Sequence, residues 1–332
     1  MHAAEKTRPA TDIDRVIALA DADMRAVNAL IRDSLASDVA LVSQVSEYII
    51  MSGGKRLRPL IVLLAARAFG YSGDQHIRAA TIIEFIHTAT LLHDDVVDSS
   101  QKRRGQDSAN TVFGNQASVL VGDFLYSRAF QMMVDIGSMR IMQILADATN
   151  TIAAGEVMQL MNVHDPDTSE DEYRQVIYRK TARLFEAGAQ IAAVLGQQGQ
   201  LVEDSMIRYG RSLGCAFQLV DDALDFNASA EELGKNIGDD LAEGKATLPL
   251  IHAMQQGSAN DVAIIRAAIR EGGLDQLDKI TSIIESTGAL QYTSARAQEA
   301  AADAIAALSD VPDSDYKQAL IVLAEFSVSR RS

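Results

Sequence analysis

The distribution of proline most strongly limits what this chain can fold into. The 332 residues contain five prolines, which leave residues 60–165 and 167–248 free of proline: Pro9, Pro59, Pro166, Pro249 and Pro312. Proline interrupts a helix because it lacks the backbone N–H and clashes with the preceding turn. The apolar residues are mainly Ala, Leu, Ile and Met, and straight-chain side chains lose little rotamer freedom in a helix. We therefore predict an all-α fold.

Apolar residues recur at helical spacing from residue 12 onward. Residues 1–11 contain Pro9 among small polar residues, and we expect them to be disordered. Short breaks, such as Gly196–Gly199, separate the predicted helices, and Pro59 fits the first turn of one of them. Strand-type alternation, internal repeats and Gly/Ser-rich linkers are absent from the sequence. We predict one helical domain over residues 12–332.

Composition and charge exclude several classes of protein. The net charge of −15 is opposite in sign to the basic surface that nucleic-acid binding needs. The single cysteine, Cys215, excludes a disulfide framework and a thiolate metal cage, and it favours a reducing cytoplasm. The N-terminal residues lack the apolar run of a signal peptide, and no stretch approaches the ~20 apolar residues of a membrane span. We expect a cytoplasmic protein without a transmembrane segment or a nucleic-acid partner.

The first unusual acidic pattern lies within residues 82–105. Successive residues of a helix are separated by about 100°, which places one histidine and four acids on one helix face: Glu84, His87, Asp94, Asp95 and Asp98. The flanking residues are apolar, so this face belongs to a helix that is otherwise buried. Neighbouring carboxylates repel one another and need a compensating cation. The pattern favours a magnesium site shared with substrate phosphates over an ordinary solvated acidic surface, which is the alternative.

A second acidic pattern lies within residues 215–227. Four side chains occupy positions i, i+3, i+4 and i+7 of one helix face: Gln218, Asp221, Asp222 and Asp225. Gly214 lies on the same face, where we expect the missing side chain to leave room for a ligand. One Asp-Asp-x-x-Asp pattern arises easily by chance. Two of them on apolar helices of one chain strongly favour a metal site.

Basic residues gather in two short segments of this acidic chain, GGKRLRP (residues 53–59) and KRRG (residues 102–105). The guanidinium fork of arginine matches phosphate oxygens, and lysine supplies a point charge. Arg103 and Arg104 follow soon after Asp98, so cations and a carboxylate-held metal would grip one polyanion, most naturally a diphosphate. The alternative is a pair of solvated loops.

Three further lysines lie near these patterns. Lys180, with Thr181 beside it, interrupts an apolar helical segment, and we predict that this lysine is buried. Lys235 and Lys245 lie in the polar segment after the second aspartate pattern.

Together these motifs resemble those of the trans-isoprenyl diphosphate synthases, the polyprenyl synthetase family. The matching segments follow the family's order and spacing: GGKRLRP, LLHDDVVDSSQKRRG, the Lys180–Thr181 pair, FQLVDDALDF and GKNIGDDLAEGKATLPL. Within the family, the chain is most similar to the bacterial octaprenyl diphosphate synthases, which make quinone side chains. The resemblance implies one all-α domain whose helices surround a deep central cavity, usually in a homodimer.

The resemblance also implies roles for the matching residues. Three magnesium ions would be held by Asp94, Asp98 and Asp221, with support from Asp95, Asp222 and Asp225. Isopentenyl diphosphate would bind Lys55, Arg58, His87 and Arg104. The allylic diphosphate would bind Arg103, Lys180, Thr181, Gln218 and Lys235. Five of these residues would act directly in catalysis: Asp94, Asp98, Asp221, Arg103 and Lys180.

The implied reaction is head-to-tail condensation of isopentenyl diphosphate onto an allylic diphosphate such as farnesyl diphosphate. We expect an octaprenyl product, with other lengths between twenty and fifty carbons as alternatives. Thr90 lies one turn before Asp94 on the same side of the helix, and the resemblance implies that Ala89 occupies a position that stops the tail in short-chain members of the family. Both residues are small here, so the growing tail should pass them. We expect bulky residues on a neighbouring helix to end the channel, although they fit simple core packing equally well: Phe130, Met132 and Met133.

Three other functions fit part of the sequence. A terpene cyclase would ionise an allylic diphosphate but needs no second diphosphate site, which the clusters around Lys55 and Arg104 argue against. A non-catalytic subunit of a heteromeric synthase usually lacks one aspartate motif, and both are present here. A purely structural acidic bundle leaves the matched motifs unexplained. For the synthase, we expect diphosphate substrates as the partners and transient membrane contact during release of a long apolar product.

Overall fold

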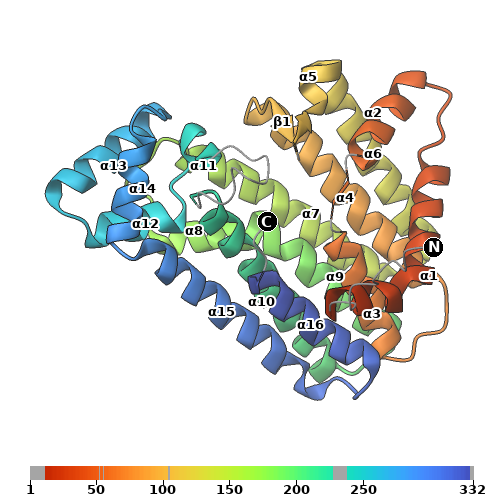
Figure 1. Cartoon of the computed structure of the whole chain (residues 1–332). Helices are drawn as coiled ribbons and strands as arrows, with labels where there is room; N and C mark the ends of the chain where they lie inside the picture. Colours follow the sequence, from red (N-terminus) through yellow and green to blue (C-terminus); the bar gives the residue numbers. More distant parts are fainter. Residues whose placement is uncertain (1–11, 52, 55, 104, 227–237, 330–332) are drawn as a thin grey trace, which may run out of the picture.

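The computed structural model describes residues 12–51, 53–54, 56–103, 105–226 and 238–329. Within these ranges the chain is helical apart from one short hairpin, which confirms the predicted all-α class (Figure 1). The predicted N-terminal disorder lies outside the described residues. The α-helices are α1 Asp12–Ser34, α2 Ala40–Met51, α3 Leu57–Ala68, α4 Gln75–Val97, α5 Ala109–Phe113, α6 Asn115–Ile136, α7 Met139–Asn162, α8 Glu170–Ile177, α9 Arg183–Leu195, α10 Gln200–Leu224, α11 Asp239–Ala242, α12 Leu248–Gln256, α13 Ala259–Glu271, α14 Leu277–Ser286, α15 Ala289–Ala307 and α16 Asp315–Ser329.

Four shorter elements complete the described secondary structure. A π-helical turn, η1 (Tyr178–Ala182), joins α8 to α9, and a 3₁₀ turn, η3 (Leu308–Asp310), follows α15. Strands β1 (Lys102–Arg103) and β2 (Gln106–Asp107) pair in an antiparallel hairpin. This hairpin was not predicted, because two-residue strands are too short to show an alternating pattern. Gly105 makes the turn possible with its φ of +78°.

Local sequence explains several helix boundaries. Pro59 lies in the first turn of α3 and Pro249 in the first turn of α12, where a missing N–H costs little. Ser169 begins α8 with a reciprocal capping box to Glu172. Gly137 ends α6 in the left-handed conformation. The predicted placement of Pro59 is confirmed.

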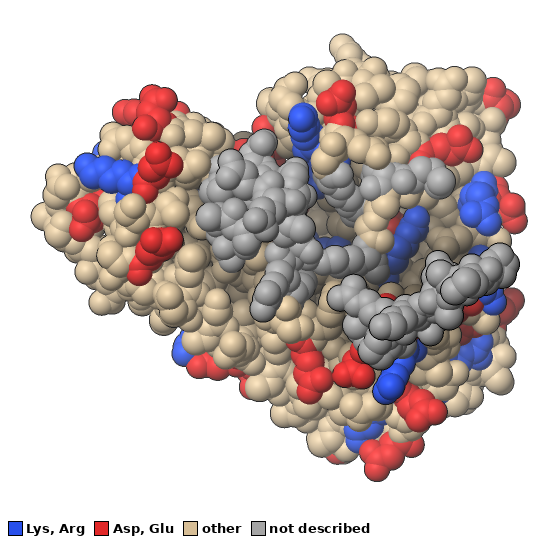
Figure 2. Space-filling view, viewed as in Figure 1, with Lys and Arg blue, Asp and Glu red and all other residues tan. Residues whose placement is uncertain are grey.

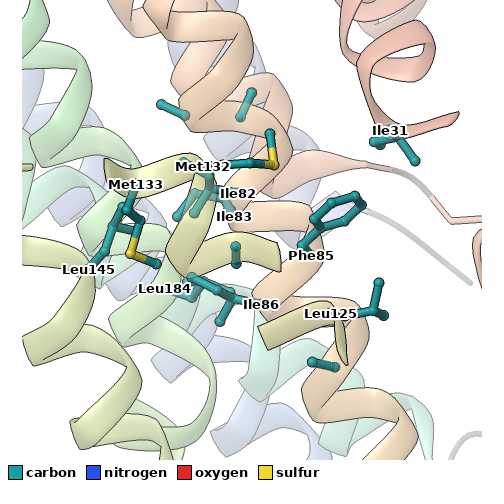
Figure 3. Packing of buried hydrophobic residues seen from close by; sticks show 14 of the residues in the cluster. Ile31, Ile82, Ile83, Phe85, Ile86, Leu125, Met132, Met133, Leu145 and Leu184 are labelled. Carbon is teal, nitrogen blue, oxygen red and sulfur yellow. The ribbon is translucent and has the colours of Figure 1, made fainter. Parts of the chain in front are cut away.

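The central helices are buried on most sides. α4 contributes Ile82, Ile83, Phe85 and Ile86 to a core shared with α6, α7 and α9, and Figure 3 shows part of this packing. α10 packs along α15, which connects it to a lobe made of α12, α13 and α14 at the left of Figure 1. Figure 2 shows that the same face of the molecule is hollowed near its centre. None of the described helices is long and apolar enough to cross a membrane.

Candidate active site

The aspartates at the carboxyl end of α4 lie beside lysines from other elements. Asp94 is in the last turn of the helix, and its Oδ2 lies 3.5 Å from Nζ of Lys180 in η1. Asp98 is the C-terminal cap, and its Oδ2 accepts a hydrogen bond of 3.0 Å from Nζ of Lys245. Both lysine side chains are largely buried, 20% and 16% exposed, which confirms the prediction for Lys180. Two segments far apart in the sequence therefore supply cations to this aspartate stripe.

Asp95, the third aspartate of the first stripe, is fully buried and faces the hairpin. Its Oδ1 accepts a hydrogen bond of 2.7 Å from Arg103 Nε and lies 2.6 Å from Arg103 Nη2 in an ion pair. Its backbone carbonyl accepts another from Asn110. Burial raises the pKa of Asp95, although Arg103 acts in the opposite direction. Arg103, expected to bind the allylic diphosphate, is paired with Asp95 in this structure and so also balances a buried charge.

The second aspartate stripe, on α10, is stabilised by neutral donors. Asp222 accepts a hydrogen bond of 2.5 Å from the Tyr173 hydroxyl and one of 2.8 Å from Gln218 Nε2. Gln218 Oε1 in turn accepts one from Thr181 at 2.9 Å. Burial and, next, repulsion by Asp240 raise the pKa of Asp222 to about 8. Thr181 and Gln218, predicted together in the site, do meet there.

Asp225 ends α10 and holds the start of α11. Its carboxylate accepts backbone hydrogen bonds from Asp239 at 3.2 Å and from Asp240 at 3.3 Å. Burial and repulsion by Asp240 raise the pKa of Asp225 to about 9. The second stripe therefore concentrates carboxylates that only a cation would fully compensate. This matches the repulsion expected of neighbouring aspartates.

The first basic cluster forms part of the packed interior. Arg56 makes an ion pair with Glu84 at 3.2 Å. Arg58 Nη1 lies 3.1 Å from His87 Nε2, and its guanidinium stacks over the Phe185 ring at 4.6 Å. Arg58 and His87 were both assigned to isopentenyl diphosphate, and the structure places them together. Three other residues of the predicted site lie outside the described residues: Lys55, Arg104 and Lys235.

One expectation about the second stripe is wrong. A Cβ at Gly214 would lie 2.5 Å from the Cα of Ala182, so the glycine lets α10 pack directly against η1. The space is filled by another helix and not by a ligand. Helix periodicity gives the direction of a residue, but it does not reveal the element that lies there.

The residues assigned to chain length divide into two groups. Ala89 and Met133 are fully buried, Met132 is 4% exposed, and all three belong to one core cluster (Figure 3). Thr90 is half-buried on α4 and donates to the His87 carbonyl. Phe130 is 42% exposed on α6, so the expectation that it lines an interior channel of this chain is wrong.

Two glutamates near the site were missed in the sequence. Glu156 on α7 accepts a hydrogen bond of 2.6 Å from Lys180 Nζ, and Glu243 pairs with Lys245. Burial raises the pKa of Glu156 to about 7, although Lys180 acts in the opposite direction. Lone glutamates in helical segments carry no distinguishing pattern, so the sequence offered no signal for either residue. Lys245 was noted there but assigned no role.

Two pockets adjoin these residues. One, of about 660 Å³, is bordered by Lys180, Gln218, Asp222 and Lys245, among others. The other, of about 670 Å³, is bordered by Asp98 together with the two glutamates. Across the described ranges, no three His, Cys, Asp or Glu side chains lie close enough to form a metal cage by themselves.

The donor set nevertheless suits magnesium. This ion keeps several waters and is commonly held by one or two carboxylates together with substrate phosphates. Oxygen donors from Asp94, Asp98 and Asp221, with lysines alongside, fit an ion that is completed by a diphosphate. The crowded carboxylates of the second stripe also favour a cation.

Comparison with known proteins identifies the family. Residues 39–287 match the family model described as polyprenyl synthetase. The chain belongs to the polyprenyl synthetase family. It is 54% identical to the octaprenyl diphosphate synthase of Haemophilus influenzae over 98% of this chain and 99% of that one. It is 53% identical to the octaprenyl diphosphate synthase of Escherichia coli, covering 96% and 99%.

Solved structures support the same assignment. The chain matches a polyprenyl synthase from Caulobacter crescentus, complexed with calcium and isoprenyl diphosphate, with a TM-score of 0.93 and 46% identity. That alignment covers 98% of this chain and 100% of the other. The family, the all-α class and the enzyme class predicted from the sequence are confirmed: this polyprenyl synthetase family member is a prenyltransferase.

Proposed function

We propose that the chain condenses isopentenyl diphosphate head to tail onto an allylic diphosphate, farnesyl diphosphate first, and releases all-trans octaprenyl diphosphate. The observation that carries this proposal is the meeting of Asp94 and Asp98 with Lys180 and Lys245 beside a pocket that the second aspartate stripe also borders. The high identity to octaprenyl diphosphate synthases supports the product length.

We assign three magnesium ions to the substrate-bound site. Asp94, Asp98 and Asp221 would hold them, with Asp95, Asp222 and Asp225 in support. When bound, magnesium supplies Lewis-acid stabilisation of the departing diphosphate. Asp95 supports this stripe indirectly, because its carboxylate is bonded to Arg103.

The chain's own side chains bind and orient the two diphosphates. Lys180 and Thr181, with Lys245 added from the structure, face the allylic diphosphate and donate to its oxygens. Arg58 and His87 orient isopentenyl diphosphate. Arg103, Gln218 and the undescribed Lys55, Arg104 and Lys235 keep the roles that their motifs imply. Developing negative charge on the leaving group is stabilised by such fixed donors.

The reaction also needs a dry cavity and a proton acceptor. Water would quench the allylic cation, and the apolar helices around α4 exclude it. The released pyrophosphate is suited to take the proton, in keeping with the lack of an obvious general-base pair in the sequence.

Product analysis tests the reaction. Purified protein, farnesyl diphosphate, labelled isopentenyl diphosphate and magnesium should give an octaprenyl product on reversed-phase chromatography. Product formed without isopentenyl diphosphate would point to a terpene cyclase. Failure of the purified chain to incorporate label would overturn the proposal and favour a non-catalytic subunit.

A substitution tests the assignment of product length. Ala89→Tyr should shorten the product to roughly fifteen to twenty carbons while the first condensations continue, because a bulky ring fills a position that is now small and buried. A full-length product from this variant would show that the tail does not pass Ala89.

We further propose a cytoplasmic homodimer. Four apolar residues on α6 are exposed in the single chain and fall within about 100° of arc: Val119, Leu120, Phe130 and Val134. A second copy of the chain would cover this face, which also accounts for the exposure of Phe130. Leu120→Asp should convert a dimer to a monomer in sedimentation velocity.

Brief contact with a membrane would help a long apolar product to leave.

A further inference from the structure

Lys180 lies between two carboxylates, of which only one belongs to an aspartate stripe. Its Nζ is 2.6 Å from Glu156 and 3.5 Å from Asp94, so the ammonium lies closer to the glutamate. The backbone fixes this arrangement. A Cβ at Gly155 would lie 2.7 Å from Arg179 Cβ and 3.0 Å from Lys180 N, so α7 touches η1 directly and brings Glu156 beside the lysine.

Lys245 repeats the arrangement with different elements. Its Nζ lies 3.0 Å from Asp98 of the first stripe, and it also pairs with Glu243, two residues earlier in the chain. Gly244, between them, has φ +73°, and its carbonyl accepts a hydrogen bond of 2.8 Å from the backbone N–H of His164. A side chain at Gly244 would collide with the His164 ring. Of the lysines assigned to the site, the two that the structure describes are thus each held by a glutamate next to a close-packed glycine.

The glutamates solve a problem that the site would otherwise have. A lysine ammonium is a mobile point charge on a flexible stem, and next to an aspartate alone it would settle on that carboxylate. It would then occupy the oxygens that the metal needs. A second carboxylate on the other side draws the ammonium away, and the lysine keeps donors for phosphate.

We propose that Glu156 and Glu243 are positioning residues that tether Lys180 and Lys245 beside the metal-binding aspartates. The tethers keep each ammonium from pairing fully with its aspartate, so that magnesium can share the carboxylate oxygens, and they aim the lysines at the allylic diphosphate. This inference rests on the proposed function and deepens it, because it assigns two residues outside every motif to the same site. Both glutamates border one pocket with Asp98 and are only 28% and 24% exposed.

A double-mutant cycle measures the tether for Lys180. Inorganic pyrophosphate with magnesium is the calorimetric probe, used with the wild type, Glu156→Gln, Lys180→Ala and the double variant. We expect Glu156→Gln to weaken binding by about tenfold in the wild-type background. In the Lys180→Ala background it should change binding less than twofold, since the glutamate acts through the lysine.

Steady-state kinetics provide a second readout. Glu156→Gln should raise the KM for the allylic substrate and the magnesium concentration for half-maximal rate, while the KM for isopentenyl diphosphate stays the same. The corresponding cycle of Glu243→Gln and Lys245→Ala should show the same dependence of the glutamate on its lysine. A general structural defect would disturb both substrates and lower the melting temperature.

The matched control is Glu203→Gln. Glu203 is also a largely buried acid paired with a cation, Arg140, but Arg140 lies sixteen residues before Glu156 on α7, which is about 24 Å along the helix. This variant should leave pyrophosphate binding unchanged.

Two results would overturn the inference. Equal losses from Glu156→Gln with and without Lys180 would mean that the glutamate contacts metal or substrate itself, and unchanged binding would mean that no tether is needed. Failure of the wild type to bind magnesium pyrophosphate would instead count against the proposed function.

Discussion

The two aspartate stripes share a sequence pattern but have opposite electrostatic surroundings. In the first stripe each carboxylate has a cation from another element, in the pairs Asp94–Lys180, Asp95–Arg103 and Asp98–Lys245. In the second stripe, Asp222 and Asp225 are bonded to a phenol, an amide and backbone N–H groups. Their pKa values rise to about 8 and about 9, mainly through burial.

This difference shows how one pattern can serve two purposes. The first stripe is already balanced, so a metal entering there must share its oxygens with lysines. In the second stripe, burial and repulsion by Asp240 raise the pKa values of Asp222 and Asp225, and a metal entering there would relieve that repulsion. The periodicity of Asp-Asp-x-x-Asp indicates a shared helix face in both cases, but distant residues decide the charge balance.

The largest expected effect comes from removing one metal-binding carboxylate from either stripe. Asp94→Asn and Asp221→Asn should each reduce turnover by about 100-fold or more while the protein stays folded, because fixed charges at a reacting diphosphate have effects of this size. Turnover measured at saturating magnesium checks the loss of activity, and circular dichroism checks that each variant is folded. Near-normal turnover in both variants would rule out the metal assignment.

The contrast between the stripes is tested most directly by the stability of the metal-free protein. Asp95→Asn should destabilise it by about 2–3 kcal/mol, because Arg103 loses a charge-assisted hydrogen bond and its ion pair with a buried carboxylate. Asp222→Asn should be neutral or stabilising, because burial already raises the pKa of Asp222 to about 8 and a neutral amide can still bond to Tyr173 and Gln218. Urea unfolding measures both free energies, and equal losses would mean that the stripes do not differ as described.

The paired arginines sharpen the comparison on the substrate side. Arg104→Ala should raise the KM mainly for isopentenyl diphosphate, and Arg103→Ala mainly for the allylic substrate. The loss of one charge-assisted contact corresponds to roughly 1.5–3 kcal/mol. Arg103→Ala should also lower stability, since Asp95 stays buried without its partner. Steady-state kinetics with each substrate varied in turn measure both KM values. The assignment would be contradicted if Arg104→Ala mainly affected the allylic substrate and Arg103→Ala mainly affected isopentenyl diphosphate.

The sequence predicted the helix face on which a side chain lies better than it predicted the neighbouring helix that the side chain contacts. Asp94 and Asp98 of the first stripe each lie beside a lysine of the site, and Lys180 is largely buried as expected. The tethering by Glu156 was not predictable, because it depends on α7 meeting η1 at Gly155. Gly214 and Phe130 were misread for the same reason. Their helix faces were clear, but the element opposite each face was not.

The smallest expected effect concerns a group of paired charges outside the site. Asp23 on α1 accepts two hydrogen bonds of 2.7 Å from Arg67 and lies 3.1 Å from His76 Nε2. The bond to Arg67 lowers the pKa of Asp23, and burial lowers the pKa of His76. Both folded-state pKa values thus lie below those of the unfolded chain, about 3.9 and about 6.5, so the unfolded chain takes up protons first as the pH falls.

Stability should therefore decline as the pH falls, through His76 below about 6.5 and through Asp23 below about 4. Asp23→Asn should lower the free energy of unfolding by about 1–2 kcal/mol at neutral pH, because Arg67 and His76 lose their shared acceptor. The gap to the wild type should narrow as the pH falls below about 4, because the wild type progressively loses the contribution of the Asp23 carboxylate. Urea unfolding across this pH range checks the prediction. Pyrophosphate binding at neutral pH is the control, and Asp23→Asn should leave it unchanged. A gap that is constant at every pH would mean that α1 is held by packing alone. Charge compensation by distant residues would then matter in this fold only at the active site.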